Sequence, residues 1–282
     1  MSRRLLVVNA DDFGLTDGVS RAVVRGHREG VVTSTSILAV ARSFDLAASL
    51  VRDAPTLGLG AHLALVGEDP PLLSAREVPT LVDRSGAFPL SWRTVVRRLA
   101  LRRIDPDDVR REFSAQLDRI AGIGVPVTHI DSHQHLHLWP SVGRIVVDLA
   151  VERGIPVVRR PRSAQLLSVG AGVAMLSALL ARRIAAAGLV STEAYAGLDE
   201  AGRLDTATLG RALAALDRQG GASAEVNAHP GEPDDAELTR FAWDYRWDAE
   251  LAALTSPDTR QRVERSGFVL GTFADLAAQA AR

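Results

Sequence analysis

Short runs of apolar and β-branched residues recur along this chain, and segments with helical periodicity lie between them. This alternation predicts parallel strands joined by helical crossovers. We expect strands at residues 5–9, 33–39, 57–65, 127–131, 156–160, 189–192, 222–228 and 268–272. We expect helices at residues 18–29, 107–120, 141–153, 205–218 and 258–265. Eight strands in this order favour a single closed but distorted (β/α) barrel of the TIM type. A length of 282 residues fits one such α/β domain over residues 1–282 as well as nearly two domains of average size.

Two long segments interrupt the alternation, and we expect both to be loops at the C-terminal face of the barrel. Residues 67–103 contain four prolines, and residues 231–248 are polar but carry Trp243, Tyr245 and Trp247. Long loops of this kind usually form binding surfaces on a rigid scaffold. The pattern therefore places a binding site at this end of the barrel.

The composition excludes several classes of chemistry. The chain has 33 basic and 34 acidic residues, a formal net charge of −1, which gives no indication of a nucleic-acid or membrane-surface partner. It contains no cysteine and no lysine, so disulfides, thiolate metal sites, Schiff bases and P-loop lysines are excluded. The most apolar stretch, residues 166–181, is too short to span a membrane, and no targeting segment stands out. We therefore expect a cytoplasmic protein without a membrane span.

Four of the seven histidines lie between residues 129 and 137. If this segment stays extended, its odd positions place His129, Asp131, His133, His135 and His137 on one face. Several neighbouring imidazoles are costly to bury without partners, whereas neutral imidazole is the commonest metal ligand. The segment thus favours a metal site, and a solvated polar loop with incidental histidines is the alternative.

Two adjacent carboxylates, Asp11 and Asp12, follow the first expected strand. Because side chains alternate across a strand, one of them can bind a metal while its neighbour faces water or substrate. The alternative is that one of them caps the next helix, although Thr16 and Asp17 are available for that purpose.

Two isolated histidines, His62 and His229, also lie at expected strand ends. His62 is a polar residue between glycine and apolar neighbours, and a hydrogen-bonded core histidine is the alternative there. His229 precedes a Pro-Gly turn. In a parallel barrel these two would meet Asp11, Asp12 and His133 at the C-terminal strand ends, where such barrels carry their active sites. One carboxylate with two imidazoles leaves coordination positions open, which favours metal-assisted hydrolysis.

Four short segments share an order along the chain that is typical of one protein family. They are Asn-Ala-Asp-Asp-Phe-Gly-Leu at 9–15, Gly-Ala-His-Leu at 60–63, His-Ile-Asp-Ser-His-Gln-His-Leu-His at 129–137 and His-Pro-Gly at 229–231. In these segments the sequence resembles the YdjC-like carbohydrate deacetylases, which include chitooligosaccharide deacetylases and hopanoid-associated deacetylases. The resemblance extends over most of the chain.

The resemblance implies a distorted (β/α) barrel, often a homodimer, that removes acetyl groups from N-acetylated sugars. The substrate it implies is an oligosaccharide or glycolipid of the N-acetylglucosamine type. It also implies a divalent metal, Mg²⁺, held by Asp12, His62 and His133. Judged by ligand softness alone, the same three residues suit Zn²⁺, Mn²⁺, Co²⁺ or Ni²⁺.

The resemblance also implies catalytic roles for three other residues. Asp11 corresponds to the general base, and His229 to the acid that protonates the leaving amine. Arg159 matches an Arg-x-Pro element and would orient the base, with Arg160 and Arg162 as alternatives for that place.

Four aromatic residues after strand ends are candidates for stacking on a sugar ring, and the alternative is that they fill the barrel mouth or a dimer contact. They are Trp139, Trp243, Tyr245 and Trp247. Two other functions remain as alternatives for the whole chain. A metal-dependent sugar isomerase or epimerase usually needs more carboxylate ligands and often a lysine. A non-catalytic sugar-binding barrel would need neither Asp11 nor His229.

Overall fold

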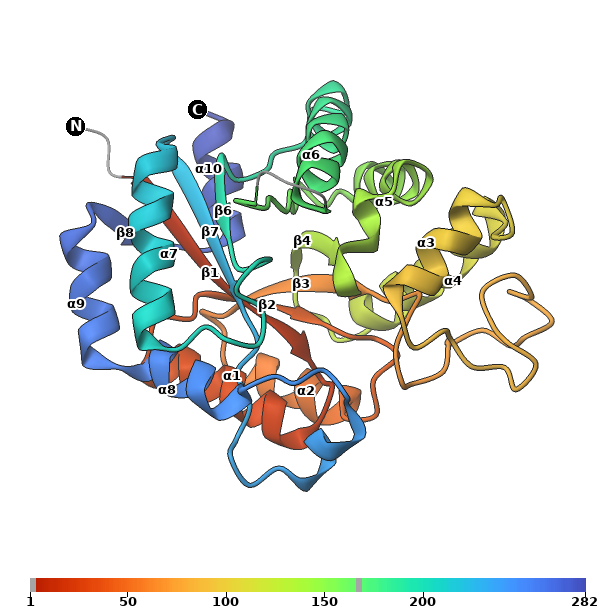
Figure 1. Ribbon diagram of the computed structural model, residues 1–282, viewed down its shortest axis with the longest axis horizontal. Helices are drawn as coiled ribbons and strands as arrows, with labels where there is room; N and C mark the ends of the chain where they lie inside the picture. The colour runs from red at the N-terminus through yellow and green to blue at the C-terminus, as the bar shows by residue number, and fades with distance from the viewer. Residues whose placement is uncertain (1–3, 166–168) are drawn as a thin grey trace.

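A curled parallel sheet organises the computed structural model, which describes residues 4–165 and 169–282 (Figure 1). Its strands are β1 (Arg4–Phe13), β2 (Ser34–Ile37), β3 (Gly58–Leu63), β4 (Val127–Ser132), β5 (Val157–Val158), β6 (Ala194–Ala196), β7 (Ser223–Ala228) and β8 (Phe268–Leu270). Seven of them follow the order β5-β4-β3-β2-β1-β7-β6. β8 pairs with Arg4–Leu6 and β2 with Asn9–Phe13, so both lie along the edge of β1 opposite β7.

Helices surround this sheet (Figure 1). They are α1 (Asp17–Glu29), α2 (Phe44–Arg52), α3 (Trp92–Ala100), α4 (Pro106–Ala121), α5 (Pro140–Arg153), α6 (Val169–Ala186), α7 (Thr206–Gln219), α8 (Trp247–Thr255), α9 (Pro257–Arg265) and α10 (Phe273–Ala280). Two short 3₁₀ helices, η1 (His133–Leu138) and η2 (Ala236–Arg240), follow β4 and β7. None of the helices in the described ranges combines the length and the apolar character that a membrane crossing requires.

Both faces of the sheet are buried, as expected for parallel strands covered by helices. The consecutive side chains Leu6, Val7 and Val8 of β1 are all at most 1% exposed. A continuous apolar run such as this one therefore marks a central strand, and the predicted parallel α/β architecture is confirmed.

The barrel is not closed evenly, because the sheet is almost interrupted between β5 and β6. A single bridge between Val157 and Val190 connects the edge at β5 to the chain leading into β6. The strand predicted at residues 189–192 is wrong, because only Val190 pairs there and the ladder with β7 forms at Ala194–Ala196. Leu189 and Val190 are two apolar residues followed by Ser-Thr-Glu, and so short a run cannot extend the sheet.

The two predicted loops contain helices that the sequence pattern did not reveal. Segment 67–103 includes α3, and segment 231–248 includes η2 and the first turn of α8. The apolar stretch at 166–181 lies largely in α6, with residues 166–168 outside the described part of the chain. Helices α2 and α10 were also missed.

Candidate active site

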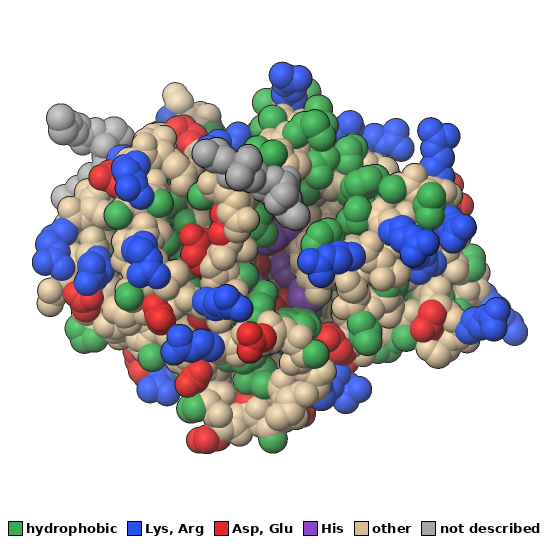
Figure 2. All heavy atoms as spheres, in the orientation of Figure 1, with side chains coloured by type: hydrophobic (Ala, Val, Ile, Leu, Met, Phe, Trp, Pro, Cys, Tyr) green, Lys and Arg blue, Asp and Glu red, His purple; other side chains and the backbone are tan. Residues whose placement is uncertain are grey.

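A cavity of about 780 Å³ lies at the C-terminal ends of the strands. Its wall includes the five residues predicted to meet there: Asp11, Asp12, His62, His133 and His229. Figure 2 shows histidine side chains at the bottom of a hollow in the surface, with hydrophobic side chains along its upper right side. The parallel sheet thus brings together residues that are separated by more than 200 positions in sequence.

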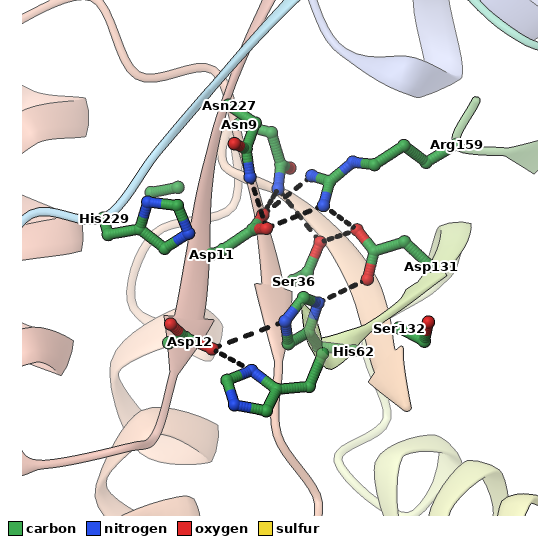
Figure 3. Close-up of polar contacts among 12 residues, drawn as sticks. Asn9, Asp11, Asp12, Ser36, His62, Asp131, Ser132, Arg159, Asn227 and His229 are labelled. Carbon is green, nitrogen blue, oxygen red and sulfur yellow. Dashed lines mark hydrogen bonds and ion pairs between the residues drawn. The ribbon is translucent and has the colours of Figure 1, made fainter. Parts of the chain in front are cut away.

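A local irregularity in β1 separates the two adjacent carboxylates. The pairing with β2 shifts between Ala10 and Phe13, and Asp12 has a φ of 62°, which non-glycine residues rarely adopt. Asp11 and Asp12 consequently point to different partners, as Figure 3 shows. Neither caps α1, because Thr16 accepts the hydrogen bond from the backbone N–H of Val19.

Asp12, His62 and His133 form a buried group whose donor atoms all lie within 4.8 Å of one another. Asp12 Oδ1 is 2.9 Å from His133 Nδ1 and 3.4 Å from His62 Nε2. It is fully enclosed, yet no described residue makes a hydrogen bond to it. Burial alone would raise the pKa of Asp12, but the neighbouring imidazoles outweigh this effect and hold that pKa well below its usual range. This donor set fits a divalent cation of borderline softness.

Asp131 orients His62 within this group. His62 Nδ1 lies 2.5 Å from Asp131 Oδ1, so its Nε2 faces Asp12 (Figure 3). A carboxylate behind a histidine ligand is a common arrangement at metal sites, where it fixes the ring and increases its basicity. Burial lowers the pKa of His62, but the charge of Asp131 and the nearby carboxylates raise it to about 10. The sequence placed Asp131 on the histidine-bearing face but assigned no role to it.

Gly60, two residues before His62, has to be small because the side chain of His129 packs directly against it. A Cβ atom at this position would lie 2.2 Å from His129 Nε2 on the adjacent strand. Only glycine therefore lets β3 and β4 approach while His129 occupies the space between them. His129 is fully buried, stacks against Phe273 and lies 3.1 Å from the hydroxyl of Ser36, so it is a core residue.

The histidine-rich segment stays extended only as far as Ser132, so the prediction of one continuous face is wrong beyond that point. Ser132 Oγ accepts the backbone N–H of His137, which draws the chain into η1. Gln134 and His135 adopt left-handed backbone conformations there. His133 and His135 still line the cavity, whereas His137 is buried and donates its Nε2 hydrogen to the carbonyl oxygen of Arg159.

Asp11 accepts hydrogen bonds from four side-chain N–H groups. Two come from Arg159, at 2.7 Å to each carboxylate oxygen, one comes from Asn9 at 2.7 Å, and one comes from Asn227 (Figure 3). Burial raises the pKa of Asp11, but the charge and hydrogen bonds of Arg159 hold it well below its usual range. Asp11 is therefore an oriented, ionised carboxylate on the cavity wall.

Arg159, rather than its neighbours, makes this contact. Its side chain is fully buried, whereas Arg160 donates to the carbonyl oxygen of Glu193 near the surface. Arg159 also forms an ion pair of 2.7 Å with Asp131, so it links the predicted base to the carboxylate behind His62. The sequence selected Arg159 through its match to Arg-x-Pro, and the structure favours it over the alternatives Arg160 and Arg162.

His229 lies at the end of β7, with its ring beside the cavity. Its backbone N–H donates to Glu250 Oε2 at 2.6 Å, and Nδ1 of the same residue is buried without a hydrogen-bond partner in the described chain. Nδ1 is 3.9 Å from Glu250 Oε2, and burial raises the pKa of Glu250. Glu250 comes from α8 and was missed, because a single glutamate in a helix carries no distinguishing signal.

Three of the four predicted aromatic residues line the cavity: Trp139, Trp243 and Tyr245. Trp247 is not on the wall among the described residues. It is 7% exposed and packs behind Tyr245, with ring centroids 5.1 Å apart. Trp92 of α3 adds another aromatic ring to the cavity wall, and the sequence analysis did not select it.

The sequence matches the family described as YdjC-like protein over residues 5–265. The chain belongs to the YdjC-like family. A YdjC-like relative from Brevibacillus brevis, named carbohydrate deacetylase, is 32% identical over 271 residues, which are 96% of this chain and 99% of the relative. A chitooligosaccharide deacetylase from Proteus mirabilis is 29% identical over 275 residues, or 96% and 98% of the two chains.

A solved structure has the same fold over its whole length. The putative cellobiose-phosphate cleavage protein from Enterococcus faecalis V583 superposes with a TM-score of 0.82 at 26% identity, over 98% of this chain and 99% of that one. The predicted family and the distorted barrel of this YdjC-like protein are thereby confirmed.

Proposed function

We propose that this YdjC-like protein is a carbohydrate N-deacetylase, a metal-dependent hydrolase that removes acetyl groups from N-acetylated sugars. The observation that carries the proposal is the buried group Asp12, His62 and His133 beside the ionised Asp11. The names of the relatives, carbohydrate deacetylase and chitooligosaccharide deacetylase, support the choice of substrate class. A divalent cation bound at this group would supply Lewis-acid chemistry, which polarises a carbonyl and acidifies water.

Asp11 is the general base in this proposal. Its four donors fix the carboxylate beside Asp12 and keep it ionised. A carboxylate with so low a pKa is a weak base, so the proton reaches it as the water attacks rather than in an earlier step. The neutral amides of Asn9 and Asn227 are easier to displace than Arg159, which leaves a lone pair of Asp11 available for this proton.

His229 is the acid, because an amide nitrogen leaves only after it gains a proton. Its ring borders the cavity on the β7 side, while Asp12 occupies the β1 side (Figure 3). Trp139, Trp243 and Tyr245 offer flat apolar surfaces on which a pyranose ring can lie. The substrate would thus lie across the strand ends with its acetamido group toward Asp12.

The proposal extends to the organisation of the protein. β8, near the end of the chain, pairs with β1 at its beginning, which supports one domain over residues 1–282. The family resemblance supports a homodimer that uses Mg²⁺, whereas two imidazole ligands favour Zn²⁺ or another transition metal. A cytoplasmic location is also part of the proposal. Because Asp11 and Asp131 are both paired with Arg159, Asp12 is the carboxylate left for a metal. Sugar isomerases usually employ more than one carboxylate ligand.

Acetate release tests the proposed function. The purified protein should release acetate from at least one member of a panel of N-acetylglucosamine mono-, di- and trisaccharides, assayed with Mg²⁺, Zn²⁺, Mn²⁺, Co²⁺ and Ni²⁺. An isomerase would change the sugar without releasing acetate, and a binding protein would change nothing. Either of these results would exclude the deacetylase proposal.

The role of His229 predicts a dependence on the leaving group. The variant His229→Ala should keep its metal and lose about 10²-fold in kcat on an N-acetylated sugar, because one acid contributes at least about that factor. It should lose much less on an activated acetyl ester, whose leaving group scarcely needs a proton. Equal losses on amide and ester would show that His229 binds substrate or the developing oxyanion instead.

A further inference from the structure

The side chain of Arg159 crosses the inside of the curled sheet, from β5 at one edge to β1 and β7. Its backbone N–H donates to the carbonyl oxygen of Ile130 at 3.1 Å, and its own carbonyl accepts from His137 at 3.1 Å. These contacts hold the start of the side chain beside β4 and β5. The guanidinium group, in contrast, meets Asp11 on β1 and Glu225 on β7. A long flexible side chain therefore spans the barrel interior.

Glu225 is an unexpected residue in the middle of β7. It pairs with Val7 on one side and Tyr195 on the other, and its side chain is fully buried. Its Oε1 accepts the Nε hydrogen of Arg159 at 2.6 Å, while Oε2 has no hydrogen-bond partner in the described chain. Burying a carboxylate with one unsatisfied oxygen is costly, so packing alone does not explain this residue.

Glu225 does not border the cavity among the described residues, so its effect on a substrate must pass through Arg159. Asp11 and Asp131 hold only the two outer nitrogens of the guanidinium group: Asp11 contacts Nη1 and Nη2, and Asp131 contacts Nη1. The bond from Glu225 to Nε is the contact that holds the third nitrogen, the one next to the side-chain stem. Contacts at all three nitrogens fix the plane of a guanidinium group. Contacts at the two outer nitrogens alone leave the group able to swing together with its side-chain stem.

We propose that Glu225 is a positioning residue, which fixes the guanidinium plane of Arg159 so that Arg159 holds Asp11 in the orientation for catalysis. This inference rests on the proposed deacetylase function. Burial raises the pKa of Glu225 to about 7 against the opposing charge of Arg159, so a neutral acceptor can serve in its place. What matters in this arrangement is the reach of the acceptor oxygen rather than a full negative charge.

Three substitutions separate reach from charge. Glu225→Gln keeps the length and one acceptor oxygen, so its kcat should stay within about threefold of the wild type. Glu225→Asp keeps the charge but is one methylene shorter, and Glu225→Met keeps neither charge nor acceptor. Both should lose roughly 10-fold to 100-fold in kcat, with little change in KM or in metal affinity, because the catalytic and metal-binding side chains remain. If Glu225→Met does not fold, the comparison of Asp with Gln still decides the question.

Glu112 provides the matched control. It is fully buried on α4, away from the cavity wall, and accepts the backbone N–H groups of Leu72 and Leu73. Glu112→Asp should lower Tm as Glu225→Asp does, but should leave kcat unchanged. If Glu112→Asp lowers kcat as much as Glu225→Asp does, the loss reflects stability and the positioning role is overturned. The same conclusion follows if neither variant lowers kcat.

Crystal structures of the Gln and Asp variants at position 225 give a readout that needs no activity. The guanidinium group of Arg159 should stay in place in Glu225→Gln and shift relative to Asp11 in Glu225→Asp. An unmoved Arg159 in both, or a kcat that follows charge instead of reach, would overturn the inference. If the wild type releases no acetate, the proposed function fails, while the position of Arg159 still decides whether Glu225 places it.

Discussion

Replacing His62 and His133 together by alanine is expected to abolish tight binding of a divalent metal and to lower acetate release by about 10⁴-fold. The two imidazoles are two of the three donors in the buried group, and the remaining Asp12 would be a single carboxylate ligand. Metal activation contributes several kcal/mol to hydrolysis, and each 1.36 kcal/mol corresponds to a factor of ten. Removal of the metal from the wild type with a chelator should have the same effect, and adding metal back should restore activity.

Metal content by elemental analysis and affinity by calorimetry measure this result directly. His27→Ala is a suitable control, because His27 lies in α1 with both ring nitrogens near hydrogen-bond partners, Val32 and Thr56. It should keep full metal content and activity. Full metal occupancy in the double variant would show that the cation binds elsewhere.

Asp11→Asn is expected to keep its metal and lose about 10²-fold to 10⁴-fold in kcat, the usual contribution of one acid–base group. The amide has nearly the same shape and still accepts one hydrogen bond from Arg159, but it cannot take a proton from water. Because the ligand group Asp12, His62 and His133 is untouched, metal affinity should change little. Single-turnover rates and metal titrations on the same preparation separate these effects.

The loss of a buried ion pair is a second consequence of this substitution, and it needs its own control. Asp69 is also buried, and it pairs with Arg42 at 3.0 Å and Arg240 at 2.9 Å without bordering the cavity. Asp69→Asn should lower Tm and leave kcat near the wild-type value. A kcat for Asp11→Asn within a few-fold of the wild type would remove Asp11 as the base.

The sequence predicts this fold well where a local pattern decides it. Continuous apolar runs and period-3.6 patterns are properties of neighbouring residues, so the central strands and the helices α1, α4, α5, α7 and α9 could be located. Parallel strands end at one face, which is why Asp12, His62 and His133 could be grouped without knowing their distances. Five helices were missed: α6 and α8 carry apolar residues on all sides, and α2, α3 and α10 are short, with eight or nine residues each.

Other features depend on contacts between distant parts of the chain, and no local pattern records those contacts. The turn at Ser132 depends on one hydroxyl that accepts a backbone N–H five residues later. Glu225 and Glu250 have the appearance of ordinary polar residues until the barrel brings them to Arg159 and His229. The shift in β1 that separates Asp11 from Asp12 arises from pairing with β2, which a single strand cannot reveal.

The opening between β5 and β6 has a consequence for the descent of this protein. One backbone bridge joins those edges, and the ionic contacts of Arg159 with β1, β4 and β7 supply a connection across the interior that the sheet lacks. Cutting a buried ion pair on one side typically costs several kcal/mol, a large fraction of the stability of a domain. We therefore expect a descendant that no longer hydrolyses substrate to keep Arg159 together with Asp11, Asp131 and Glu225. Replacing any one of these four residues alone would leave a buried charge unpaired and destabilise the fold.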